Sequence, residues 1–155
     1  ILRCLVGSEM CIRDSKFHIR SPGNESGLRS IHDFHFFAPV KGSITSDFDA
    51  ANEHYAIDVA AAEDTPIKAI LDGTVIDTYW SVETGNVIVI QHDLGLISLY
   101  KHNSALLKKV GSFVRAGDAI AVIGNTGEMT TGTHLHFELW HDRVPLDPKQ
   151  FINFN

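Results

Sequence analysis

The chain has 155 residues, of which 44% are hydrophobic and 21% charged, as expected for one ordinary globular domain. Nineteen acidic residues against thirteen basic ones give a formal net charge of −6. This balance predicts no broad positive surface and argues against nucleic acid as a partner. The apolar stretches are far shorter than the ~20 residues that a membrane-spanning helix needs, so we expect no membrane span.

The first part of the chain lacks a sustained hydrophobic period and is polar over residues 21–27. Residues 4–15 also resemble translated sequencing-adapter sequence. We therefore expect residues 1–35 to form a disordered or artefactual tail and residues 36–155 to form the folded domain. Both cysteines, Cys4 and Cys11, lie in this tail. Neither a disulfide scaffold nor a zinc cluster of thiolates is expected.

From residue 36 onward, short β-branched runs alternate with turns that contain Gly or Asp, a pattern typical of an all-β sandwich or barrel. The expected strands cover residues 43–46, 57–60, 67–70, 73–80, 86–92, 96–102, 119–123 and 134–141. Residues 103–110 alone look helical, because Ser104 can cap a turn that carries Leu106, Leu107 and Val110. The predicted fold is all-β, mainly antiparallel, with one short helical turn.

Nine histidines are the unusual feature of the composition, since His is the commonest metal ligand and general base. His134 and His136 lie two apart in an expected strand, so their side chains share one face. They could bind one metal together, or one could bind while the other acts on a metal-bound water. The alternative is a pair of polar residues on a solvated sheet face.

His54 and Asp58 are a second candidate pair, four residues apart. On a helix they would share a face, but on a strand they would lie about 13 Å apart. A shared metal therefore requires a helical turn or a loop that folds His54 back toward Asp58. Taken alone, the pair favours two surface residues, and it gains weight only in combination with His134 and His136.

Two further candidates lie on expected strands. His102 ends the alternating run that carries Tyr100 on the same face, although a lone His there is usually just exposed. Glu138 has the strand parity of His134 and His136, so its carboxylate can orient a ring N–H. An ordinary exposed strand residue is the alternative for Glu138.

Three motifs follow one another along the chain: His54-x-x-x-Asp58, Tyr100-x-His102 and Gly132-Thr-His134-Leu-His136-Phe-Glu138. In this order they resemble the lysostaphin/LytM-type zinc metallopeptidases, a family that cuts peptidoglycan cross-bridges. Residues 39–46, 69–75, 111–124 and 144–148 also resemble family segments, so the resemblance covers residues 36–154.

The resemblance implies that His54, Asp58 and His136 bind one Zn²⁺ per chain, while His102 and His134 are catalytic and line the reacting water. Three protein ligands leave a fourth position for that water. The family also implies a β-sheet fold with a groove between loops. It further implies endopeptidase action on stem peptides or cross-links of peptidoglycan, and an extracytoplasmic location in the periplasm or cell envelope.

The sequence departs from the family pattern at Ala56, where Gly is usual, at Thr133, where Pro is frequent, and at Lys101 and Asn103. If position 56 required a positive φ, its Cβ would cost on the order of 1 kcal/mol. Two alternatives remain. Residues 114–120 also resemble biotin and lipoyl carrier domains, although the turn at 124–127 offers no Lys for modification. A noncatalytic peptidoglycan-binding or hydrolase-regulating domain is the other alternative.

Overall fold

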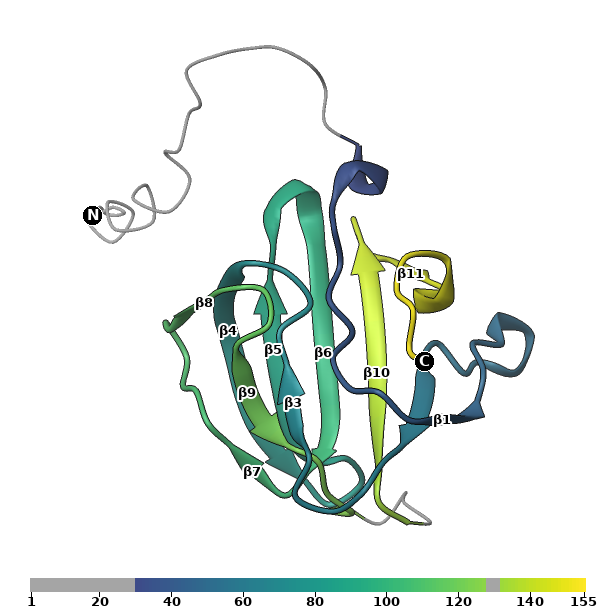
Figure 1. Ribbon diagram of the computed structural model, residues 1–155, viewed down its shortest axis with the longest axis vertical. Helices are drawn as coiled ribbons and strands as arrows, with labels where there is room; N and C mark the ends of the chain where they lie inside the picture. The colour runs from purple at the N-terminus through teal and green to yellow at the C-terminus, as the bar shows by residue number, and fades with distance from the viewer. Residues whose placement is uncertain (1–29, 128–131) are drawn as a thin grey trace. The chain divides into compact units, whose positions relative to one another are not determined.

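The computed structural model describes residues 30–127 and 132–155 (Figure 1). Eleven strands form in this part of the chain: β1 (Ser43–Ser46), β2 (Ile57–Ala60), β3 (Pro66–Lys68), β4 (Gly73–Ser81), β5 (Gly85–Gln91), β6 (Leu96–Asn103), β7 (Ala105–Leu106), β8 (Phe113–Val114), β9 (Ala119–Val122), β10 (His134–His141) and β11 (Val144–Leu146). Helical structure in these residues is confined to four 3₁₀ turns: η1 (Ile31–Asp33), η2 (Ala50–Asn52), η3 (Asp93–Gly95) and η4 (Pro148–Gln150). No helix there is long and apolar enough to cross a membrane.

The strands form two antiparallel sheets. The larger sheet has the order β1-β2-β10-β6-β5-β4-β8, with β11 paired to β10, and the smaller sheet has the order β3-β9-β7. The smaller sheet lies over the β4–β6 part of the larger one (Figure 1). The predicted all-β, mainly antiparallel fold is confirmed.

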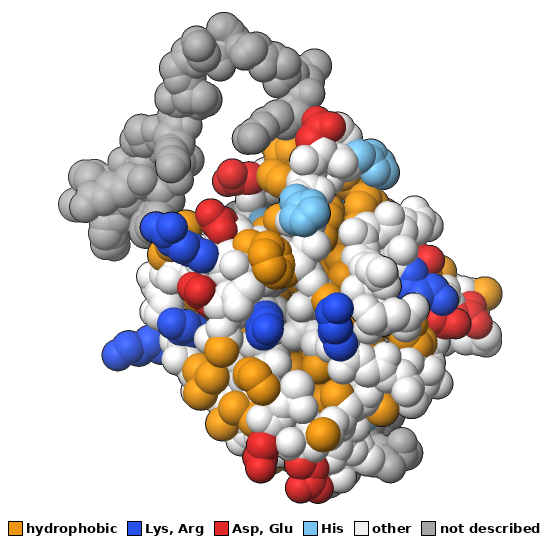
Figure 2. Space-filling model, viewed as in Figure 1, with side chains coloured by type: hydrophobic (Ala, Val, Ile, Leu, Met, Phe, Trp, Pro, Cys, Tyr) orange, Lys and Arg blue, Asp and Glu red, His pale blue; other side chains and the backbone are white. Residues whose placement is uncertain are grey.

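The core joins the two sheets. Ile67 and Ile120 of the smaller sheet belong to the same buried cluster as Ile88 and Tyr100 of the larger one. In β6 buried and partly buried residues alternate from Leu96 to His102, as the period of two requires when one face of a strand is covered. Basic and acidic side chains are both spread over the face shown in Figure 2, between apolar patches.

The prediction of a helix over residues 103–110 is wrong. Ala105 and Leu106 pair with β9, and the backbone N–H of Leu107 donates to Ile120 O at 2.9 Å. These cross-strand hydrogen bonds satisfy the backbone in an extended form, so the propensity of the segment does not decide its structure. The three short strands β7, β8 and β11 were not expected from the sequence.

A series of buried hydrogen bonds connects His92 to two residues of β6, Ser98 and Tyr100. The ring of His92 donates from Nδ1 to Asp72 O at 2.8 Å, and its Nε2 lies 2.8 Å from Ser98 Oγ. Ser98 Oγ in turn lies 3.0 Å from the hydroxyl of Tyr100, which accepts from the Ile70 N–H at 3.3 Å. Burial lowers the pKa of His92 and raises that of Tyr100. Both groups are therefore held neutral inside the fold.

One compact unit runs from Ile31 to Asn155. Ile31, Phe34 and Phe36 lie partly buried against the core, and the rings of Phe36 and Phe151 are 5.6 Å apart. The expected tail over residues 1–35 thus includes a segment that packs. Residues 1–29 lie outside the described part of the chain.

Candidate metal centre

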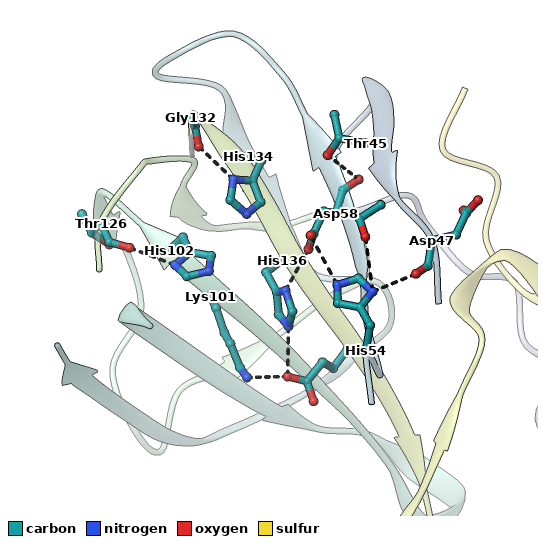
Figure 3. Close-up of polar contacts among 12 residues, drawn as sticks. Thr45, Asp47, His54, Asp58, Lys101, His102, Thr126, Gly132, His134 and His136 are labelled. Carbon is teal, nitrogen blue, oxygen red and sulfur yellow. Dashed lines mark hydrogen bonds and ion pairs between the residues drawn. The ribbon is translucent and has the colours of Figure 1, made fainter. Parts of the chain in front are cut away.

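Asp58 and His136 meet because their strands are neighbours. β10 pairs antiparallel with β2, and in that register His136 is the cross-strand partner of Asp58. Directly opposed residues on one face have their Cβ atoms only about 5 Å apart, so their side chains can touch. His136 Nδ1 lies 2.8 Å from Asp58 Oδ1 (Figure 3).

A loop brings His54 to the same place. Asp49 caps η2 by accepting from the Ala51 and Asn52 N–H groups, and Glu53 adopts a left-handed conformation with φ 59°. Reciprocal backbone hydrogen bonds between Asp49 and His54 then close the turn. His54 Nε2 comes to 3.3 Å from Asp58 Oδ2. His54 therefore reaches Asp58 through a loop that folds back, and not through a helical turn shared by the two residues.

The orientation of His54 is set by its other ring nitrogen. Its Nδ1 lies 2.7 Å from the carbonyl oxygen of Asp47, which can only accept, so Nδ1 carries the proton. In the neutral ring Nε2 then carries the lone pair, and it faces Asp58. This is the tautomer that a metal-binding imidazole needs.

Donor atoms of His54, Asp58 and His136 all lie within 4.8 Å of one another. Two imidazole nitrogens and one carboxylate oxygen are a donor set that zinc prefers. All three side chains are partly exposed, at 25%, 17% and 19%, so solvent reaches the group. The residues therefore fit a zinc ion with three protein ligands and an open side.

His102 and His134 lie beside this group. Their ring centroids are 5.0 Å apart, and the His102 ring lies 5.8 Å from that of His136. His102 donates from Nδ1 to Thr126 O at 2.9 Å, and His134 donates from Nδ1 to Gly132 O at 2.8 Å (Figure 3). In both rings the Nε2 atom is thereby left as a proton acceptor.

The backbone adopts a left-handed conformation at His102 and at nearby Gly85. His102 has φ 65°, a conformation that is uncommon for a residue with a Cβ, and its N–H donates to Thr84 O at 2.9 Å. Gly85, with φ 66°, allows Thr126 to approach closely, because a Cβ there would collide with the Thr126 hydroxyl. The loop that carries Thr126 is thus packed where it can orient the His102 ring.

The pKa values of three residues in the site are shifted by burial and by neighbouring groups. Burial alone would raise the pKa of Asp58, but the hydrogen bond and charge of His136 outweigh it and hold that pKa below its usual value. Burial alone would lower the pKa of His136, but its hydrogen bonds to Asp58 and Glu138 outweigh burial and hold that pKa above its usual value. Burial is the main cause that lowers the pKa of His102, which favours the neutral ring.

A second layer of polar contacts surrounds His136. Glu138 is only 6% exposed, and its Oε1 lies 3.4 Å from His136 Nε2 and 2.5 Å from Lys101 Nζ. The indole N–H of Trp140 donates to Glu138 Oε2 at 2.8 Å. Burial would raise the pKa of Glu138, but the bonds from His136 and Lys101 prevail and lower it to about 2.

The sequence profile of Peptidase family M23 matches residues 52–148, more than half of the chain. The chain belongs to Peptidase family M23. The resemblance to the lysostaphin/LytM-type metallopeptidases is confirmed. As an M23 domain, the chain spans about a quarter of the length of the curated relatives it matches.

Two curated relatives differ in the activity that their names describe. An uncharacterized metalloprotease of Buchnera aphidicola is 41% identical over 96 residues, which cover 62% of this chain and 25% of that protein. The murein hydrolase activator EnvC of Escherichia coli is 38% identical over 94 residues, which cover 61% of this chain and 22% of that protein.

Solved structures of peptidases share the fold. A zinc-containing peptidase from Vibrio cholerae superposes with a TM-score of 0.70 at 32% identity, covering 74% of this chain and 39% of that one. The catalytic domain of lysostaphin from Staphylococcus simulans superposes with a TM-score of 0.59 at 31% identity, covering 76% and 89%.

The structure brings the five histidine and aspartate side chains expected at the site together, namely His54, Asp58, His102, His134 and His136. The concern over Ala56 does not apply, because its φ is not positive and its side chain is fully buried. The contacts of Lys101 and Trp140 with Glu138 were missed. In the sequence, the signal for Lys101 is its position immediately before His102, where it departs from the family pattern.

Proposed function

We propose that this M23 domain is a zinc-dependent endopeptidase that hydrolyses peptide cross-links or stem peptides of bacterial peptidoglycan. The observation that carries the proposal is the convergence of His54, Asp58 and His136 donors within 4.8 Å, with His102 and His134 beside them. In such a site a bound zinc ion acts as a Lewis acid and lowers the pKa of a water molecule.

The side chains at the site would have two roles, metal binding and proton transfer. His54, Asp58 and His136 would hold the metal. In its neutral form, each of His102 and His134 presents Nε2 as a proton acceptor, because the Nδ1 protons are bound by the carbonyls of Thr126 and Gly132. One such nitrogen can take the proton of the attacking water, and a protonated ring can stabilise the oxyanion. A glutamate base is then unnecessary.

The class of substrate is supported by the relatives. Their names include murein hydrolase activators and DD-carboxypeptidase/endopeptidases, and murein is peptidoglycan. A peptidoglycan substrate places the proposed site of action outside the cytoplasm, in the periplasm or cell envelope.

A noncatalytic activator of other wall hydrolases is the second candidate, favoured by the similarity to EnvC. Such a domain needs a surface that binds its partner but no metal donors. The donor set of this chain is complete, and two further imidazoles lie next to it. These features support the peptidase, because binding alone does not require a set of metal donors.

The experiment that separates the two functions measures zinc content and hydrolysis in one sample. Purified protein is analysed for metal and incubated with purified peptidoglycan, and the released peptides are analysed by mass spectrometry. We expect about one zinc per chain, new peptide termini, loss of hydrolysis on chelation and recovery on addition of zinc. Zinc-free protein that still cleaves would contradict the metal assignment, and zinc-loaded protein that cleaves no peptide would favour the activator.

A further inference from the structure

His136 has both ring nitrogens engaged, and its two partners are different carboxylates. Nδ1 lies 2.8 Å from Asp58 Oδ1, on the side of the candidate metal donors. Nε2 lies 3.4 Å from Glu138 Oε1, on the opposite side of the ring. His136 and Glu138 are two apart on β10, so the strand's period of two places both side chains on the same face.

The Glu138 carboxylate is itself held in place from two directions. Lys101 lies on β6 directly opposite His136, and its ammonium reaches Glu138 Oε1. The Trp140 indole N–H donates to the other oxygen, Oε2, at 2.8 Å. A buried carboxylate with both oxygens occupied by donors has little freedom to move, and it accepts hydrogen bonds without donating any.

A fixed acceptor beside Nε2 has one consequence for the ring. It favours the tautomer with the proton on Nε2 and leaves the lone pair of Nδ1 for a metal on the Asp58 side. Histidine ligands commonly depend on such a partner, and its loss typically weakens metal binding about 10- to 100-fold. Lys101 contributes indirectly, because it neutralises a carboxylate that would otherwise be buried without a counter-charge.

We infer that Glu138 is a positioning residue that binds the Nε2 proton of His136 and so presents His136 Nδ1 as a metal-binding atom, with Lys101 and Trp140 holding its carboxylate. The inference rests on the proposed function, because it requires His136 to bind zinc. It adds a specific role for three residues that lie outside the expected ligand and catalytic set.

The test compares zinc affinity among the wild type and the variants Glu138→Ala, Glu138→Gln and Glu63→Gln, by competition with a chromogenic chelator. Glu63 is exposed and serves as the control. We expect Glu138→Ala to bind zinc about 10- to 100-fold more weakly. Glu138→Gln keeps an oxygen that can accept from Nε2 and should recover part of this loss, whereas Glu63→Gln should match the wild type.

A spectroscopic measurement tests orientation separately from stability. Nitrogen-15 NMR of the zinc-loaded wild type should show His136 with its proton on Nε2. Zinc affinity of Glu138→Ala and Glu138→Gln equal to that of Glu63→Gln, or a proton on Nδ1 in the wild type, would overturn the inference while leaving the proposed function intact. Failure of the wild type to bind zinc would instead contradict the proposed function and the inference together. If Glu138→Ala does not fold, Glu138→Gln and the NMR measurement still decide the question.

Discussion

Asp58 and His136 are cross-strand partners on β2 and β10, and their side chains meet at 2.8 Å. Two donors of the candidate metal centre therefore lie on neighbouring interior strands of the larger sheet. Only the third donor, His54, depends on a loop. This arrangement places two of the three donors where the backbone is held by hydrogen bonds on both sides.

Removal of Asp58 should empty the site. In Asp58→Ala, His54 and His136 lose the carboxylate that lies between them, and two imidazoles alone bind zinc weakly. We expect zinc content well below one per chain and no measurable hydrolysis, determined by metal analysis and peptide release. The matched control is Asp77→Ala, an exposed aspartate on β4. Full zinc occupancy in Asp58→Ala would remove Asp58 from the ligand set.

His102 should be needed for rate and not for metal. Its ring donates to the Thr126 carbonyl and lies beside His136, outside the three-donor group. We expect His102→Ala to keep wild-type zinc content and to lose about 10²- to 10⁴-fold in hydrolysis. Metal analysis and initial rates on the same preparation check both expectations. A zinc-free His102→Ala protein would show that His102 supports metal binding.

His92 should make the folded protein sensitive to acid. Burial lowers its pKa in the folded state, so the unfolded chain binds this proton more readily. The stabilisation is present above the ordinary pKa of about 6.5 and is lost as the pH falls toward the folded value, by up to about 1.4 kcal/mol per pH unit.

The test for His92 compares denaturant unfolding of the wild type and His92→Gln at pH 7.5 and pH 5.5, both with a chelator present. The wild type should lose more unfolding free energy on acidification than the variant does. Equal losses would mean that the pKa of His92 is the same in the folded and the unfolded state.

Residues 1–29 should be dispensable, because the compact unit begins at Ile31. A chain that starts at Ser30 keeps Ile31, Phe34 and Phe36, which pack against the core. We expect its melting temperature and hydrolysis rate to equal those of the full chain. A further deletion through Phe36 is the contrasting variant and should lower the melting temperature. A clear fall already on removal of residues 1–29 would show that this segment contributes to the fold.

Local patterns in the sequence were sufficient for most of the strands. Alternation and turn residues predicted β1, β2 and β10 with the bounds that form, because the exposure of successive residues alternates along β1, β2 and the first part of β10. The same reasoning failed at residues 103–110, where β9 supplies hydrogen bonds from a distant part of the chain. The short strands β7, β8 and β11 carry too short a pattern to be recognised.

Part of the site also follows from local sequence patterns, and part depends on the folded structure. The parity of His134, His136 and Glu138 followed from the strand period, and Glu138 does face a ring nitrogen of His136. The pairing of Lys101 with Glu138 could not be foreseen, because it depends on the register between β6 and β10. The return of His54 to Asp58 likewise depends on the Asp49 cap and the left-handed Glu53.

The central claim is the division between metal-binding and catalytic histidines, and the contrast of His134→Ala with His136→Ala tests it most directly. The two residues lie two apart on one face of β10, so the substitutions are matched in position and chemistry. We predict that His136→Ala loses zinc and hydrolysis, while His134→Ala keeps about one zinc per chain and loses about 10²- to 10⁴-fold in rate. Zinc lost in His134→Ala and retained in His136→Ala would reverse the assignment, and wild-type hydrolysis by both variants would contradict the peptidase account.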